Sequence, residues 1–281
     1  MTGPVFLLSD FGNDDVYVGV VRAVLAGVAP HAPLHDLTHQ IAPFDLLAAR
    51  FQLAAVLPWL PNGSVLLAVV DPGVGSDRRG LALQAAAPDG RTVHAVGPDN
   101  GLFASLLRPA RAPYGTDLRA HAAVDLAPDP DHRPGPGATF DGRDRFAPAA
   151  GRLARGEPLA SLGATVTLDA LAAPSLLAPR REGDVVVGTV LHVDRFGNLI
   201  SDLTPDVLPA PPWRASIANV TVRGPSRSFA SVPRGSPLLY LGSSGTAEVA
   251  VREGNAAAVL AAERGTPVRI GPDRSDPASP A

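Results

Sequence analysis

The stretch that decides the fold is Val65-Leu66-Leu67-Ala68-Val69-Val70-Asp71-Pro72-Gly73-Val74-Gly75-Ser76-Asp77-Arg78-Arg79. Its apolar first half predicts a strand buried on both faces, and the acid, proline and glycines that follow can continue neither a strand nor a helix. Asp71 therefore comes at a strand end, and ligands of open α/β sheets bind outside the carboxyl ends of the strands. Asp71 and Arg78 are either placed there for chemistry or form a salt-bridged structural turn.

Composition excludes several classes of protein. The 281 residues are 46% hydrophobic and 18% charged, with a net charge of -3, so no basic surface suggests nucleic acid as a partner. A small cationic or zwitterionic ligand is easier to accommodate. The chain has no cysteine, which removes disulfides, thiolate metal sites and a cysteine nucleophile. All 24 basic residues are arginine, so a Walker A lysine and a Schiff base are excluded.

Hydrophobic runs give no sign of a membrane partner. None approaches the ~20 residues needed to span a bilayer, and the start of the chain lacks the charged and long apolar regions of a secretory signal. We therefore expect a cytoplasmic protein.

The first half of the chain alternates strand and helix patterns. Strands are predicted at 5–8, 34–39, 64–70 and 93–96, and helices at 16–28, 45–57 and 144–155. This alternation indicates an α/β domain with a mainly parallel sheet. Asp14 or Asp15 is available to cap the first helix and Asp45 the second. Three of the strands end in acidic or amide-bearing loops, which favours a composite site along one sheet edge.

The second half has short strand-like segments separated by Gly, Pro and Ser turns. They span 185–193, 215–222, 237–241 and 247–251, and their spacing indicates a small all-β, barrel-like domain. We expect an α/β domain over 1–165, a linker over 166–184, a β-barrel domain over 185–271 and a disordered tail over 272–281.

Several polar clusters allow both a functional and a structural interpretation. Asp10, Asp15 and Asn100 suit sugar hydroxyls, although capping and turn formation would also explain Asp15 and Asn100. His35 and His39 have the spacing of two metal ligands on a helix, but their segment is predicted to be a strand, so no metal site is expected.

Three glycine-containing loops also lack a decisive functional signal. The Gly73-Val74-Gly75 segment has no lysine behind it, so a nucleotide phosphate is not indicated. The segments 194–198 and 242–245, taken alone, are best interpreted as hairpin turns.

Six motifs taken together resemble one family, the S-adenosylmethionine hydroxide adenosyltransferases, which are relatives of the bacterial fluorinase and chlorinase. They occur in the family's order: Ser9-Asp10-Phe11-Gly12, Asp36-Leu37-Thr38-His39, Val70-Asp71-Pro72-Gly73-Val74-Gly75-Ser76-x-Arg78, Pro98-Asp99-Asn100-Gly101, Thr139-Phe140-x-Gly142-Arg143-Asp144-x-Phe146-Ala147-Pro148 and Asp194-x-Phe196-Gly197-Asn198. Each motif alone is weak, but they span residues 9 to about 255.

The resemblance implies a fold and a reaction. It implies an N-terminal α/β domain, a C-terminal β-barrel and a homotrimer whose active sites lie between one subunit's N-terminal domain and a neighbour's C-terminal domain. Water or hydroxide would attack ribose C5′ of S-adenosylmethionine, giving adenosine and L-methionine without a cofactor. The sulfonium leaves as a neutral thioether and needs no acid, so the enzyme mainly orients and desolvates the nucleophile.

The resemblance also implies roles for individual residues. Asp71 and Arg78 match two members of the family's water-binding Asp, Arg and His set. The substrate-binding positions that it implies are Asp10, Phe11, Asp15, Phe44, Asn100, Asp194, Phe196, Asn198, Ser243 and Ser244. Of these, Asp10 and Asp15 match positions around the ribose, and Ser243 and Ser244 fall in an adenine-binding loop.

The third catalytic position departs from the family. Its Thr-Phe-His-Gly-Arg-Asp motif has Asp141 in place of the histidine here. Histidine has a reference pKa near 6.5 and suits a base at neutral pH, whereas the reference pKa of aspartate is near 3.9. We therefore expect hydrolysis that is slow or has a shifted pH profile, with Asp141 as the third catalytic residue.

Two other functions fit the same resemblance. One is a halogenase of the chlorinase kind, although a retained Asp71 would repel chloride. The other is a non-catalytic protein that binds S-adenosylmethionine or adenosine and has lost turnover with its histidine.

Overall fold

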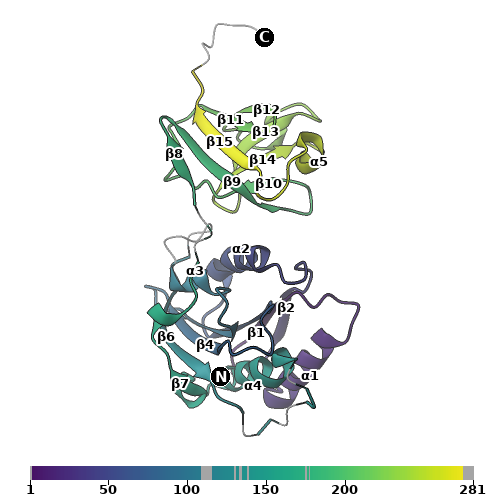
Figure 1. The fold of residues 1–281 in the computed structure, drawn as a ribbon, viewed down its shortest axis with the longest axis vertical. Helices are drawn as coiled ribbons and strands as arrows, with labels where there is room; N and C mark the ends of the chain where they lie inside the picture. The colour runs from purple at the N-terminus through teal and green to yellow at the C-terminus, as the bar shows by residue number, and fades with distance from the viewer. Residues whose placement is uncertain are drawn as a thin grey trace. The chain divides into compact units, whose positions relative to one another are not determined.

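A computed structural model describes residues 2–108, 116–129, 131–132, 135–137, 139–174, 176 and 178–274 (Figure 1). The chain divides into two compact units, Met1–Ser175 and Leu176–Ala281. This division falls within the predicted linker 166–184, which also contains a helical turn, η5 (Leu168–Ala170), and a strand, β8 (Arg180–Glu182). No helix of the described segments is long and apolar enough to cross a membrane.

The first unit is built on a seven-stranded mixed sheet. Its strands are β1 (Val5–Ser9), β2 (Leu34–Thr38), β3 (Ser64–Val69), β4 (Gly80–Ala86), β5 (Thr92–Pro98), β6 (Arg119–Leu126) and β7 (Gly163–Thr165), in the order β2-β1-β3-β5-β4-β6-β7. β2, β1, β3 and β5 pair in parallel, and the other three strands pair antiparallel. The predicted α/β class with a parallel core is confirmed, but β4, β6 and β7 were not predicted.

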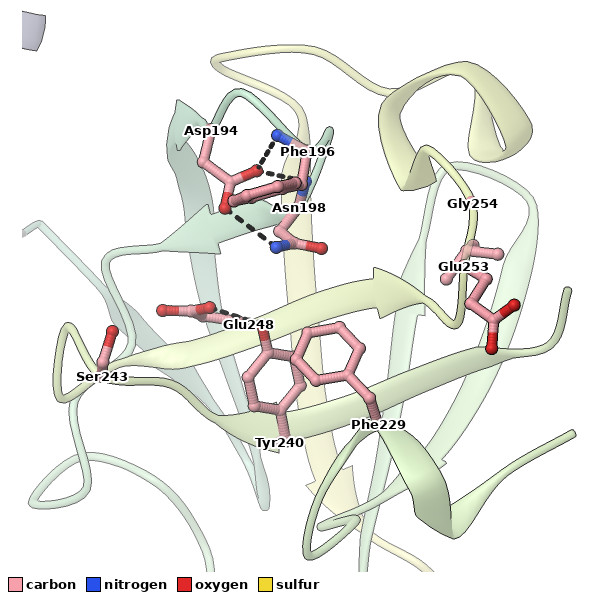
Figure 2. Close-up of a pocket in the computed structure, with 10 residues that line it drawn as sticks. Asp194, Phe196, Asn198, Phe229, Tyr240, Ser243, Glu248, Glu253 and Gly254 are labelled. Atoms are coloured by element: carbon pink, nitrogen blue, oxygen red, sulfur yellow. Dashed lines mark hydrogen bonds between the residues drawn. The ribbon is translucent and has the colours of Figure 1, made fainter. Parts of the chain in front are cut away.

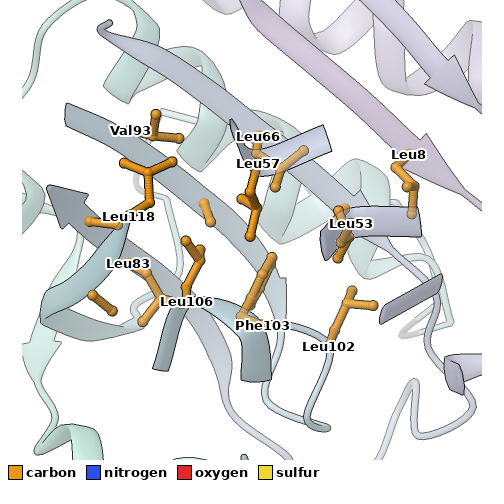
Figure 3. Packing of buried hydrophobic residues seen from close by; sticks show 14 of the residues in the cluster. Leu8, Leu53, Leu57, Leu66, Leu83, Val93, Leu102, Phe103, Leu106 and Leu118 are labelled. Carbon is orange, nitrogen blue, oxygen red and sulfur yellow. The ribbon is translucent and has the colours of Figure 1, made fainter. Parts of the chain in front are cut away.

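Helices cover both faces of this sheet. They are α1 (Tyr17–Val28), α2 (Leu46–Val56), η1 (Leu57–Trp59), α3 (Ala104–Leu107), the π-helical turn η3 (Gly142–Phe146), α4 (Ala147–Ala154) and η4 (Leu159–Ser161). Residues of α2 and α3 pack on one face, as Figure 3 shows for Leu53 and Leu106 around Leu66, and residues of α1 and α4 pack on the other. Because β3 is buried along its whole length, the prediction of a strand buried on both faces is confirmed.

The two predicted helix caps had different outcomes. The Asp45 carboxylate accepts a hydrogen bond from the Ala48 amide, so it caps α2 as predicted. The prediction for α1 was wrong, because Val16 occupies the N-cap position and no side chain caps the helix. Asp14 and Asp15 are instead exposed before the helix begins.

The second unit is an antiparallel, nearly closed barrel. Besides β8, its strands are β9 (Val185–Val193), β10 (Leu199–Ser201), β11 (Trp213–Ile217), β12 (Val220–Gly224), β13 (Pro237–Leu241), β14 (Ala247–Val251) and β15 (Pro267–Pro272), with the helices η6 (Phe229–Ser231) and α5 (Ala256–Leu260). Their order is β12-β11-β15-β9-β10-β14-β13. The end strands β12 and β13 also contact each other, so the predicted barrel-like class is confirmed.

Two predicted boundaries in this unit differ from those in the structure. The single strand predicted over 215–222 was wrong, because the chain reverses between β11 and β12, with Ala218 at φ 48°. The predicted tail begins at Pro272, which is the last residue of β15. Asp273 and Arg274 follow it and are described, whereas residues 275–281 of that tail lie outside the described residues.

Gly97 fixes the distance between β5 and β3, next to the strand end that carries Asp71. A Cβ at Gly97 would lie 2.2 Å from the Ala68 carbonyl oxygen and 3.0 Å from the Phe103 ring. Gly97→Ala should therefore lower the free energy of unfolding by about 1–3 kcal/mol or more, measured by thermal and denaturant unfolding.

The matched control is Gly27→Ala in α1. A Cβ added at Gly27 would have no heavy atom within 4 Å, and alanine is the better helix former, so stability should be unchanged or higher. Equal stability of the two variants would contradict the close approach at Gly97.

Candidate active site

A cavity of about 370 Å³ lies in the first unit, where the loops after β1 and β3 meet. It is lined by Asp10, Phe11, Tyr17, Pro43, Phe44, Val69, Asp71, Val74, Thr139, Phe140, Asp141 and Gly142. Because β1 and β3 are parallel neighbours, their carboxyl ends carry Asp10 and Asp71 to the same sheet edge. The cavity therefore lies at the sheet edge where the sequence predicts a composite site.

Arg78 joins the two candidate catalytic carboxylates. Its Nε donates to Asp71 Oδ1 at 2.7 Å, and its Nη2 donates both to Asp71 Oδ2 and, at 2.6 Å, to Asp141 Oδ2. The Gly73 amide also donates to Asp71 Oδ1, at 3.3 Å. Both oxygens of Asp71 are therefore occupied by hydrogen-bond donors of the protein.

The Arg78 guanidinium is buried beneath the cavity and stays charged. Burial lowers its pKa, but the hydrogen bonds and charges of Asp71 and Asp141 outweigh burial, so the net pKa is raised above the ordinary arginine value. The guanidinium also lies over the Phe146 ring, 5.4 Å from its centroid. Arg78 does not line the cavity and acts through the two acids that it holds.

Asp141 differs from Asp71 in having a free oxygen. Its Oδ2 accepts from Arg78 and, at 3.4 Å, from Arg145 Nη1. Its Oδ1 has no hydrogen-bond partner among the described residues, and Asp141 lines the cavity. This oxygen is the acceptor that the Asp71, Arg78 and Asp141 cluster presents to a ligand or water.

Asp10 lies across the same cavity and fixes the backbone of Phe44. Its Oδ2 accepts from the Phe44 amide at 2.8 Å. Phe44 has φ 66°, an uncommon conformation for a bulky residue, and its side chain is 66% exposed. Strained residues of this kind cluster at functional sites, and Phe44, one of the substrate-binding positions that the resemblance implies, lines the cavity.

Burial raises the pKa of the Asp10 carboxyl. The amides of Phe44 and Asp10 oppose this rise, and the charge of Asp71 adds to it. Because the pKa is raised in the folded protein, ionising Asp10 costs folding free energy as the pH rises through that pKa. An ionised Asp10 at this position therefore lowers the free energy of unfolding.

Two of the predicted substrate residues of this unit do not line the cavity. Asp15 is exposed ahead of α1. The Asn100 side chain donates to the Val70 carbonyl at 2.9 Å and accepts from the Leu102 amide at 3.2 Å. Asn100 thus has the turn-forming role that the sequence left open, next to Asp71.

A second cavity, of about 720 Å³, lies in the barrel unit and is shown in Figure 2. It is lined by Asp194, Phe196, Asn198, Phe229, Tyr240, Ser243, Glu248, Val251, Glu253 and Gly254. Four predicted residues are among them, namely Asp194, Phe196, Asn198 and Ser243. Ser244 does not line the cavity, because it is buried behind Glu248.

The turn after β9 is both structural and exposed to the cavity. Asp194 accepts from the Phe196 amide at 2.9 Å, and from the Asn198 amide and side chain, both at 2.8 Å (Figure 2). The Phe196 ring, 75% exposed, lies beside this turn. The hairpin-turn interpretation is therefore correct, and the turn also places an exposed aromatic ring at the cavity.

Glu248 is a lining residue that the sequence interpretation missed. Its carboxylate accepts from the Tyr240 hydroxyl at 2.7 Å and from the Ser244 hydroxyl. Burial and this carboxylate raise the pKa of Tyr240 well above its usual range. The available signal was an acid within the apolar strand Ala247–Val251. Phe229, whose ring packs against Tyr240 at 5.2 Å between centroids, was also missed.

Metal-binding chemistry has no cluster to support it in the described part of the chain, where no three His, Asp or Glu side chains gather as ligands. His39 hydrogen-bonds Ser9 through Nδ1, at 2.7 Å. The two-histidine spacing seen in the sequence therefore has another explanation.

Comparisons with known proteins agree with this geometry. Residues 5–163 match the model of the SAM hydroxide adenosyltransferase N-terminal domain, and residues 188–269 match that of the C-terminal domain. An (R)-S-adenosyl-L-methionine hydrolase of Thermus thermophilus is 46% identical over 95% of this chain and 99% of its own length. A fluorinase of Actinoplanes sp. is 22% identical over 71% of each chain.

A solved structure has the same fold. An uncharacterized conserved protein from Thermotoga maritima superposes with a TM-score of 0.82 at 28% identity, covering 95% of this chain and 99% of that one. With both family models matched in order and a relative of nearly full length, the chain belongs to the SAM hydroxide adenosyltransferase family.

Proposed function

We propose that this protein hydrolyses S-adenosyl-L-methionine to adenosine and L-methionine. The relative from Thermus thermophilus is named as such a hydrolase, and its similarity extends over nearly the whole chain. The observation that carries the proposal is the pair of carboxylates, Asp71 and Asp141, joined by Arg78 beside a cavity, with one carboxylate oxygen left free.

The reaction needs an oriented water more than an acid. The water oxygen forms a bond to ribose C5′ while the bond from C5′ to sulfur breaks, and its electron pair goes to the sulfur, which leaves as a neutral thioether. The water gives up one proton as the new bond forms. The enzyme must hold the water in line with the breaking bond and accept or relay that proton.

We assign the water to Asp141 Oδ1. Both oxygens of Asp71 are engaged by Arg78, and Asp71 therefore acts as a positioning residue for the guanidinium. Arg78 in turn holds Asp141 Oδ2, which leaves Oδ1 to accept from water. Arg145, 3.4 Å from the same Oδ2, adds a second positive charge. The reference pKa of aspartate, near 3.9, makes it a weaker base than histidine, so we expect slow turnover at neutral pH.

The charges around the cavity favour hydrolysis over halogenation. Three carboxylates, those of Asp10, Asp71 and Asp141, line it, and the two guanidiniums of Arg78 and Arg145 only partly compensate their charge. This net negative charge attracts a sulfonium cation and repels chloride or fluoride. A non-catalytic binding protein remains as an outcome of the product test below.

The barrel cavity supplies the groups for the rest of the substrate. The exposed Phe196 and Phe229 rings offer faces on which a purine can stack. Asn198 and Ser243 offer hydrogen-bonding groups, and the carboxylates of Asp194 and Glu248 suit an amino acid ammonium group. We propose that these residues bind the adenine and methionine ends, with Asp10, Phe11 and Phe44 around the ribose.

We also propose a homotrimer in which each site combines the α/β cavity of one subunit with the barrel cavity of its neighbour. The support is the family to which the chain belongs and the separation of the implied substrate residues into two cavities.

Mixing variants tests this assembly. Sedimentation should give three times the 28.9 kDa chain mass. Trimers reassembled from equal amounts of Asp71→Asn and Asn198→Ala chains should regain about a quarter of wild-type activity, because some sites then combine two intact halves. A monomer, or mixed chains as inactive as each variant alone, would contradict the proposal.

Product analysis tests the function itself. The protein is incubated with S-adenosyl-L-methionine, with and without chloride, and the products are separated by chromatography. Adenosine and L-methionine should form in equal amounts in both tubes. A chloride-dependent halonucleoside would show a halogenase, and binding by calorimetry without product would show a non-catalytic protein.

Substitutions at Asp141 test the assignment of the water. Asp141→Asn keeps the shape but removes the charge, and should lower kcat by about 10²–10⁴. Asp141→His supplies a group with a reference pKa near 6.5 and should raise the rate near neutral pH or shift the pH profile. Steady-state rates from pH 5 to 10 measure both effects.

Asp125→Asn is the matched control, because Asp125 also faces Arg145, at 3.9 Å, but does not line the cavity. Its rate should equal that of wild type. If Asp141→His left both the rate and the pH dependence unchanged, the role of Asp141 would be wrong.

A further inference from the structure

The loop after β1, which carries Asp10 and Phe11 into the cavity, is held by a residue that the proposed mechanism does not use. β1 and β2 pair in parallel, with Leu8 opposite Thr38, so the residues that follow the two strands lie side by side. His39 follows β2, and its motif had no assigned role beyond the family resemblance.

His39 contacts this loop at two points. Its Nδ1 lies 2.7 Å from Ser9 Oγ, and its carbonyl oxygen accepts from the Gly12 amide at 2.8 Å. Ser9 Oγ also accepts from the Phe11 amide at 3.3 Å. Ser9 and His39 are only 3% and 6% exposed. The bonds therefore enclose the backbone segment that carries Asp10.

The Ser9 hydroxyl can be the donor in its contact with His39. Ser9 Oγ accepts from the Phe11 amide, so its own hydrogen is available to donate to His39 Nδ1. The other ring nitrogen, Nε2, is buried and makes no hydrogen bond to the described residues, although it lies 3.2 Å from Asp36 Oδ1. Asp36 is itself paired with Arg22 at 2.5 Å. The chain of contacts runs from Arg22 through Asp36, His39 and Ser9 to the Phe11 amide.

We propose that His39 is a positioning residue, which orients the Asp10 loop for the ribose through Ser9. The proposal rests on the proposed function, since it assigns the ribose to Asp10. His39 is held by the contact of its Nδ1 with Ser9 and by the bond from the Gly12 amide to its carbonyl, and through Ser9 it orients the Phe11 amide.

Two other roles do not fit the geometry. The Ser9, His39 and Asp36 side chains have the composition of a hydrolase triad, but Ser9 is buried and does not line the cavity. A metal site is disfavoured because no group of three His, Asp or Glu side chains that could hold an ion occurs among the described residues.

Ligand-selective binding to the full chain tests this role. Titration calorimetry measures the dissociation constants of adenosine and of L-methionine for wild type, His39→Leu, His39→Asn and Ser9→Ala. His39→Leu and Ser9→Ala should weaken adenosine binding by about tenfold, the size expected from one buried hydrogen bond. His39→Asn should recover much of that loss, because its amide oxygen can accept from Ser9. Methionine binding should stay unchanged.

Thr38→Val is the matched control, because among the described residues the Thr38 hydroxyl bonds only to the Gln40 amide of its own loop. It should bind both ligands as wild type does. Unchanged adenosine binding in Ser9→Ala, or equal losses for adenosine and methionine in the folded variants, would overturn the role of His39. Wild type that bound neither ligand would overturn the proposed function as well.

Discussion

The site depends on one buried guanidinium, that of Arg78, which forms ion pairs with two carboxylates. Arg78 is 9% exposed at its side chain, and its partners Asp71 and Asp141 are 6% and 15% exposed. Breaking a buried pair by removing one member typically costs about 3–5 kcal/mol, because a charge is left uncompensated. The three side chains therefore stay together, and their bonding pattern leaves a single carboxylate oxygen directed at the cavity.

The sheet explains why these groups meet. The parallel pairing of β1 with β2 and β3 brings the loops that carry Asp10, His39 and Asp71 to one edge. Hydrogen bonds between the loops then fix their conformations. The Asp10 carboxylate accepts from the Phe44 amide, and the Asn100 side chain donates to the Val70 carbonyl. The His39 carbonyl accepts from the Gly12 amide. The cavity is shaped by this network more than by any single loop.

Much of the fold could be predicted because its patterns are local. The apolar run before Asp71 and the alternation of strands and helices indicated the parallel core, and four of the strand ends were placed within a few residues. β4 and β6 were missed because their alanine-rich sequences lack the β-branched and aromatic residues typical of strands. The β11–β12 hairpin was missed because its turn has Ala218, and no glycine, in the left-handed region.

The residues that line the candidate site could largely be predicted, but the hydrogen bonds between their side chains could not. The acids at strand ends and the aromatic Phe44 were found from order and motif. That Arg78 occupies both oxygens of Asp71, and that Arg145 reaches Asp141, depends on side-chain conformations that no sequence pattern specifies. Glu248 is brought to the barrel cavity by the pairing of β14 with β10, which is distant in sequence, and Phe229 by the packing of its ring against Tyr240.

The central claim is that a water molecule held at Asp141 becomes the 5′ oxygen of adenosine. The most direct measurement is hydrolysis of S-adenosyl-L-methionine in ¹⁸O-labelled water, followed by mass spectrometry of both products. The account predicts one labelled oxygen in adenosine, located at the 5′ position, and none in methionine. Label in methionine, or adenosine formed without label, would contradict it.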